Sequence, residues 1–98
     1  MRIEWSPLAL RDRQSIFEYI KADNPLAAVR MDDRIQSRIE RLPDFPLLGR
    51  VGRVEGTREL VIAGTPYVAA YKVEPERILV LRLLHGARMW PDPREEAG

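Results

Sequence analysis

Two copies of one helix-start signal constrain the fold of this chain more than any other feature. Each copy is a small polar residue followed by proline, Ser6-Pro7 and Asn24-Pro25, which is typical of an N-cap followed by the first helical residue. After the second signal, apolar residues recur every three or four positions until Pro43, which cannot continue a helix. This stripe predicts a helix from Pro25 to about Leu42, and its members are Ala28, Met31, Ile35, Ile39 and Leu42.

The segment between the two signals predicts a first helix, from Pro7 to Ala22. Only Asp23 and Asn24 separate it from the second helix, so the two helices must form an antiparallel hairpin. Upstream, Arg2 to Trp5 is short and alternating, which predicts a strand that leads into the first helix. The apolar residues that recur at helical spacing in the first helix are Ala9, Ile16, Phe17 and Ile20.

Three later runs are rich in apolar and β-branched residues and predict strands: Arg58 to Ile62, Tyr67 to Val73 and Arg77 to Leu84. A turn that contains proline separates each run from the next, which favours an antiparallel meander. The segment from Pro43 to Glu55, rich in proline and glycine, is expected to be an ordered crossing loop. The sequence therefore predicts one α+β domain over residues 1–98: a strand, an α-hairpin and a three-stranded meander, with a flexible tail from about residue 92.

The last of these runs is apolar on both of its faces. A helical pair can shield only one face of a small sheet, so the other face needs a further layer. A protein partner is the simplest source of that layer, although the loops and the tail could also cover it, or it could be a mixed surface. Leu79, Leu81 and Leu83 are predicted to point to one side, and Ile78, Val80, Arg82 and Leu84 to the other.

Composition narrows the possible chemistry. The chain has no cysteine and one histidine, which excludes disulfides and thiolate metal sites and argues against a histidine metal site. We therefore expect chemistry that needs no metal and no other cofactor. No apolar run is long enough to cross a bilayer, and the charged amino terminus does not resemble a secretory signal, so the expected location is the cytoplasm.

Basic side chains concentrate in the part of the chain that holds the predicted strands. Residues 45–91 contain seven basic and four acidic residues. The GRVGR sequence could place Arg50 and Arg53 close together for contact with a phosphate or a carboxylate, although exposed loop arginines are often only solvated. Arg88 and Trp90 follow the last strand, and Arg, Trp and Tyr are frequent anchors of protein interfaces.

His85 is the only side chain whose unperturbed pKa lies near neutrality, so it is the first candidate for proton transfer. Arg58 and Arg82 can lie on neighbouring strands and could stabilise a phosphoryl transition state beside it. A histidine at a strand end is more often a hydrogen-bonded structural group. Glu55 and Glu59 are candidate bases, but an ion pair with Arg53 or Arg58 is the better expectation for them.

The order of these elements and several short motifs together resemble the RelE/ParE toxin superfamily, and the ParE branch most closely. The motifs are Ser6-Pro7-x-Ala9, Asn24-Pro25-x-Ala27-Ala28, Gly49-Arg50, GTREL from Gly56 to Leu60, and LLHGARMWP from Leu83 to Pro91.

The resemblance implies a βααβββ fold and a bacterial type II toxin that a cognate antitoxin neutralises in a hetero-oligomer. In this superfamily the carboxy-terminal segment of the antitoxin wraps the toxin. The residues expected to bind it here are Ile78, Val80, Arg82 and Leu84.

The branches of the superfamily differ in their target. RelE-like members cleave mRNA on the ribosome without a metal, and His85, Arg58 and Arg82 would be the catalytic residues of that alternative. However, Val68 stands where the family's central catalytic arginine would be, and no tyrosine follows Tyr71. ParE-like members are associated with DNA gyrase, and this reading is the one the sequence favours. Its target-binding residues would be Arg50, Arg53, Arg58, Arg88 and Trp90.

Overall fold

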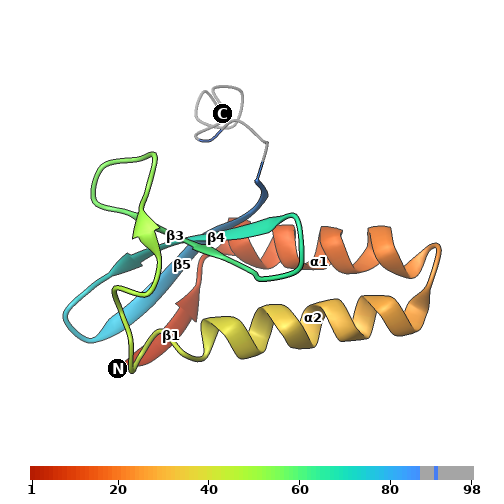
Figure 1. The fold of residues 1–98 in the computed structure, drawn as a ribbon, viewed down its shortest axis with the longest axis horizontal. Helices are drawn as coiled ribbons and strands as arrows, with labels where there is room; N and C mark the ends of the chain where they lie inside the picture. The colour runs from red at the N-terminus through yellow and green to blue at the C-terminus, as the bar shows by residue number, and fades with distance from the viewer. Residues whose placement is uncertain (87–89, 91–98) are drawn as a thin grey trace.

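The structure is a computed structural model of the chain, and it describes residues 1–86 and Trp90. The predicted α+β fold is confirmed, with its elements in the expected order along the chain (Figure 1). The elements are β1 (Arg2–Trp5), α1 (Pro7–Lys21), α2 (Pro25–Ile39), β2 (Arg50–Val51), β3 (Arg58–Val61), β4 (Tyr67–Val73) and β5 (Arg77–His85).

Both helices begin where the sequence predicts. The Ser6 hydroxyl accepts a hydrogen bond from the Ala9 N–H at 3.0 Å, and Asn24 Oδ1 accepts one from the Ala27 N–H at 3.1 Å. These caps satisfy backbone donors that have no partner inside the helix. The expected end of α2 at Leu42 was wrong, because α2 ends at Ile39 and tight turns follow it.

The sheet has five strands in the order β1-β5-β4-β3-β2. The meander of β3, β4 and β5 is antiparallel as predicted, and β1 pairs with β5 in parallel. The segment from Pro43 to Glu55 was expected to be only a loop, but it contains β2, which pairs Arg50 with Glu59 of β3. A strand of two residues is too short to produce an alternating pattern in the sequence.

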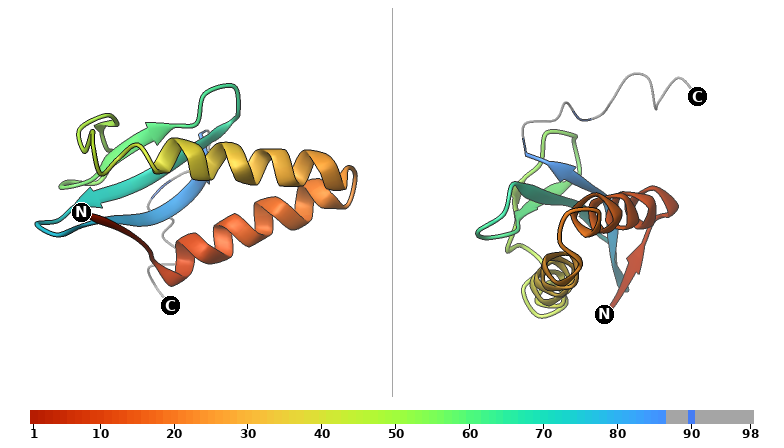
Figure 2. Two further views of the ribbon diagram at one scale, coloured as in Figure 1. Left: turned by 90° about the horizontal axis from the view of Figure 1, so that it is seen from below. Right: turned by 90° about the vertical axis from the view of Figure 1, so that its right-hand side faces the viewer.

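Both helices lie on the same side of the sheet, as Figure 2 shows. Ala9 of α1 and Ile35 and Ile39 of α2 pack there against the strands. Burial of these apolar side chains is the main favourable contribution to the stability of such a layer. The strand residues of this core are Leu60, Ala69, Tyr71, Ile78, Val80 and Leu83.

The prediction that Ile78 and Val80 share a face with Leu84 was wrong. Both side chains are fully buried in the core beneath the helices. The register between β4 and β5 shifts at Ala70 and Tyr71, because a β-bulge places an additional residue, Leu81, in β5. A bulge reverses the alternation of side chains along the strand, so Leu83 returns to the helix side and Leu84 pairs with Val68 on the other face.

Within the described residues, neither helix is long and apolar enough to cross a membrane.

Candidate functional site

The loop between β2 and β3 is organised by a buried carboxylate. Glu59 lies on β3 and only 1% of it is exposed. One of its oxygens, Oε2, accepts a hydrogen bond from the Arg53 backbone N–H at 2.7 Å, and the Arg53 Nε lies 3.1 Å from the same oxygen. Arg50 Nη2 approaches the other oxygen, Oε1, at 3.5 Å. The expected ion pair between Glu59 and Arg53 is therefore confirmed.

Two opposing effects set the pKa of Glu59. Burial raises the pKa, but the hydrogen bonds from the Arg53 backbone and guanidinium and the contact with Arg50 outweigh burial, so the net shift is downward. Glu59 is therefore an ionised group whose oxygens are already engaged, which makes it poorly suited to act as a general base.

The loop itself is ordered by its own backbone. The Gly52 N–H donates to the Thr57 carbonyl at 2.8 Å, and the Thr57 hydroxyl donates to the Val54 carbonyl at 2.6 Å. On this frame the Arg50 side chain is 61% exposed and the Arg53 side chain 37% exposed. We call residues 50–57, which comprise β2 and the loop that leads to β3, the basic loop. It presents two arginines at the surface in a geometry that is already formed.

Arg58 and Tyr71 hold the crossing loop against the helix side of the sheet. Arg58 Nη1 donates to the Gly49 carbonyl at 2.8 Å. The Tyr71 hydroxyl accepts from the Gly49 N–H at 2.9 Å and donates to the Pro46 carbonyl at 2.7 Å. Burial raises the pKa of Tyr71. No side chain fits at Gly49, since an added Cβ would lie 2.7 Å from the Tyr71 ring.

Arg82 is paired with Asp12 of α1. Arg82 Nε lies 2.7 Å from Asp12 Oδ2, and Arg82 Nη2 lies 3.0 Å from Asp12 Oδ1. Asp12 Oδ2 also accepts from the Leu83 N–H at 3.0 Å. The side chains are only 6% and 12% exposed, so this bidentate pair joins α1 to β5 just beyond the end of β1.

His85 lies at the exposed end of β5, opposite Tyr67, with the two ring centroids 6.2 Å apart at an interplanar angle of 83°. Arg58 lies opposite Tyr71, four residues away along β4, which corresponds to about 13 Å of strand. The three residues proposed for catalysis are therefore not brought together: Arg58 and His85 lie toward opposite ends of the meander, and Arg82 is bound to Asp12.

Two of the predicted target-binding residues, Arg88 and Trp90, come after the last strand. Arg88 lies outside the described residues, and Trp90 is described as partly buried. Across residues 1–86 and Trp90, no group of three or more histidine, aspartate and glutamate residues could hold a metal ion.

A family model described as the ParE toxin of the type II toxin–antitoxin system parDE matches residues 3–90. The chain belongs to the ParE toxin family of type II toxin–antitoxin systems. Among relatives of this ParE-family toxin, the Y4kP protein of Sinorhizobium fredii is 39% identical over 90 residues, which cover 92% of this chain and 93% of that protein. Toxin RelE2 of Caulobacter vibrioides is 35% identical over 88 residues, with 90% and 98% covered.

A solved structure supports the fold of this ParE-family toxin. A chain from the chromosomal ParDE toxin–antitoxin system of P. aeruginosa superposes with a TM-score of 0.81 at 24% identity, and the match covers 87% of this chain and 95% of that one. The resemblance to the RelE/ParE superfamily that the sequence motifs indicated is thereby confirmed.

Sequence reasoning missed two residues of this site. Asp12 stands on the polar side of α1, and nothing in the local pattern indicates that it pairs with a residue 70 positions later. Tyr71 is the second residue: the sequence assigns it to a strand but gives no role to its hydroxyl. Its alternation with Ala69 and Val73 predicts the strand, but not a bond to a loop 25 residues upstream.

Proposed function

We propose that this toxin interferes with DNA gyrase by direct protein contact, and that a cognate antitoxin neutralises it by forming a hetero-oligomer. The observation that carries the proposal is the basic loop, which offers Arg50 and Arg53 at the surface on a backbone that is already ordered. Binding through an ordered loop loses little conformational entropy, and arginine is enriched among the residues that dominate interface energy.

The positions of Arg58 and Arg82 argue against a nuclease site and so favour a toxin that acts by protein contact. Arg82 is neutralised by Asp12 in a buried pair, and Arg58 donates to the Gly49 carbonyl. A metal-independent nuclease would need several cations and a proton donor directed at one phosphate, and His85 is distant from Arg58 along the sheet. Val68, at the position after Tyr67, supplies no further cation.

The antitoxin is proposed to bind the sheet face opposite the helices. Ile78 and Val80 cannot take part, because both are fully buried in the core. On the opposite face, Val61 is 43% exposed and Leu79 is partly buried. These two residues replace Ile78 and Val80 in the proposed contact. Leu84, 1% exposed, and Arg82, 5% exposed and paired with Asp12, are also too buried to contribute.

A ribosome-dependent mRNA endoribonuclease is the second candidate. Two observations favour it: a relative that is 35% identical is named RelE2, and His85 is exposed at the end of β5. In this alternative the protein would cleave mRNA without a metal and would use His85 as the proton donor.

One pair of assays separates the two candidates. The purified protein is added to a gyrase supercoiling reaction and, separately, to translating ribosomes whose mRNA ends are mapped. We expect supercoiling to be inhibited and the mRNA to remain intact, for the wild type and for His85→Ala alike. Cleavage at codon boundaries that disappears in His85→Ala, with supercoiling unchanged, would establish the nuclease instead.

A further inference from the structure

One side of α2 carries a row of arginines that the proposed function does not use. Arg30, Arg34 and Arg38 follow one another at steps of four residues, and Arg41 comes directly after the helix. Residues four apart lie on the same side of a helix, about 6 Å further along its axis at each step. We call these four residues the arginine face of α2.

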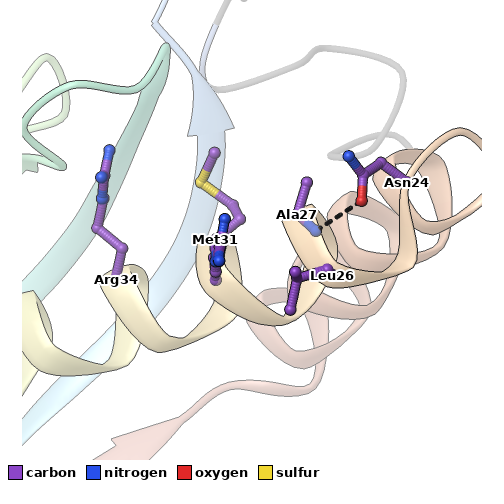
Figure 3. A pocket seen from close by; sticks show the side chains of 6 residues that line it. Asn24, Leu26, Ala27, Met31 and Arg34 are labelled. Atoms are coloured by element: carbon purple, nitrogen blue, oxygen red, sulfur yellow. Dashed lines mark hydrogen bonds between the residues drawn. The ribbon is translucent and has the colours of Figure 1, made fainter.

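Two grooves run along the arginine face, and Arg34 lines both of them. The first has a volume of about 190 Å³ and is lined by Arg30 and Arg34 together with Leu26, Ala27 and Met31. Figure 3 shows Met31 and Arg34 directed to the same side of α2. This groove therefore combines an apolar lining with two guanidinium groups.

The second groove, of about 340 Å³, continues the first toward the sheet. Ser37, Arg38 and Arg41 line it beside Arg34, and Ile62 and Ala63 form its apolar part. Arg34 reaches across to the turn after β3, since a Cβ added at Gly64 would lie 3.0 Å from Arg34 Nη1. Neither groove is lined by aspartate or glutamate.

The charge of the arginine face is not neutralised within the part of the chain that the structure describes. None of its four guanidinium groups forms an ion pair there, whereas Arg13 pairs with Asp32 across the helical hairpin. The nearby Glu40 accepts a hydrogen bond from Gln36 instead. Arg38 Nε donates to the Val61 carbonyl at 3.3 Å, and Arg41 stacks on the Phe45 ring at 5.4 Å.

Interaction with the C-terminal end of α2 explains only some residues of the arginine face. Arginines near the C-terminal end of a helix interact favourably with its last carbonyls, which accounts for Arg38 and Arg41. Arg30 and Arg34 lie too far from that end. The apolar lining contributed by Leu26, which is 56% exposed, also has no role in that explanation.

We propose that the arginine face of α2 binds an acidic polypeptide segment whose carboxylates alternate with apolar side chains. The carboxylates would pair with the guanidinium forks, a geometry that arginine favours. The apolar side chains would cover Leu26 and Met31 in the first groove and the exposed Ala63 in the second. This surface goes beyond the proposed function, which uses the basic loop and the opposite face of the sheet.

A nucleic acid strand fits the same surface less well. Proteins that bind single strands combine a basic groove with aromatic side chains on which bases stack, and no aromatic residue lines either groove. A phosphate backbone would engage the arginines and leave the apolar lining uncovered.

The test uses the full chain and three fluorescent probes of equal length: an acidic peptide with leucine at every third position, an all-glutamate peptide and a single-stranded DNA oligonucleotide. We expect the leucine-containing peptide to bind at least about tenfold more tightly than either of the others. Arg30→Ala and Arg34→Ala should each weaken its binding by about tenfold, as expected for loss of a charge-assisted bond. Arg34→Lys should fall between wild type and Arg34→Ala, because it keeps the charge and loses the fork.

The matched control is Arg11→Ala, an exposed arginine on α1 that lines neither groove; it should bind the peptide like wild type and have the same melting temperature. The proposal is overturned if the oligonucleotide binds most tightly, which would make the surface a nucleic-acid interface. Equal binding of the two peptides would overturn it as well, because only net charge would then be recognised. An absence of peptide binding, or equal effects of Arg11→Ala and Arg34→Ala, would also contradict it. None of these outcomes depends on whether gyrase is the target.

Discussion

Glu59 is the residue that most directly sets the geometry of the basic loop. Its buried carboxylate accepts from both the backbone and the side chain of Arg53, so one group orders the loop and also holds its second arginine in place. The same contacts lower the pKa of Glu59. This produces a measurable dependence of stability on pH.

Glu59→Gln should flatten the acid limb of the stability profile. The folded-state pKa lies below the ordinary value of 4.5, so the stabilising effect of Glu59 is complete above pH 4.5 and is lost as pH falls through the folded-state pKa. The variant has no such proton to bind, and its free energy of unfolding should fall less steeply below pH 4.5 than that of wild type. Urea unfolding at a series of pH values measures this. The control is Glu55→Gln, an exposed carboxylate of the same loop; identical acid limbs for all three proteins would show that Glu59 does not act in this way.

Tyr71→Phe tests the hydroxyl that ties the crossing loop to the sheet. The variant keeps the buried ring but leaves the Gly49 N–H and the Pro46 carbonyl without their partner. We expect a loss of about 1–3 kcal/mol in the free energy of unfolding, because unsatisfied buried polar groups are costly. Chemical denaturation measures it. Tyr19→Phe, at a site that is 80% exposed, should have almost no effect, and an equal loss in the two variants would contradict the role given to the Tyr71 hydroxyl.

At the scale of elements, the contact between α1 and β5 includes one buried ion pair, Asp12 with Arg82. β1 ends at Trp5 while β5 continues, so the edge of β5 is no longer covered by a strand from there on. Asp12 takes the place of the missing strand by accepting from the Leu83 N–H and from Arg82. These hydrogen bonds to Asp12 hold α1 against the edge of the sheet.

Asp12→Ala should therefore be strongly destabilising, by about 3–5 kcal/mol, because it leaves the Arg82 guanidinium buried without a partner. The double variant Asp12→Leu with Arg82→Met should recover part of that loss, since it removes the unpaired charge and fills the space. Thermal and urea unfolding of both proteins measure the difference. A double variant less stable than Asp12→Ala would show that the unpaired charge is not the main cost.

The sequence predicts features that depend on residues close together in the chain, and it does not predict features that depend on distant ones. Ser6-Pro7 and Asn24-Pro25 place helix starts through contacts three residues away, and both were predicted. The face of the sheet on which Val80 lies was not predicted, because it depends on a β-bulge that only the pairing of β5 with β4 reveals. The pairing of Asp12 with Arg82 joins residues 70 positions apart and leaves no local pattern. Pairing of Glu59 with Arg53 was predictable because the two lie six residues apart.

At the scale of the whole molecule, the two helices shield one face of the sheet (Figure 2). Val61, on the other face, is 43% exposed. A partner that binds only the folded toxin stabilises it by mass action, by about 2.7 kcal/mol at a hundredfold excess over its dissociation constant. Co-production with the protein encoded by the adjoining reading frame should therefore raise both the yield of dissolved protein and the melting temperature. A toxin that is equally stable and equally well dissolved alone would contradict the idea of an antitoxin bound to the sheet.

We propose that the basic loop acts by contact with gyrase, and a supercoiling titration with three purified proteins tests this most directly. We expect the wild type and Arg11→Glu to inhibit supercoiling at similar concentrations. Arg50→Glu, which reverses the most exposed charge of the loop, should require at least about tenfold more protein, while its melting temperature should confirm that it is folded. Supercoiling that is unaffected by the wild type, or inhibited equally by Arg50→Glu, would contradict the account.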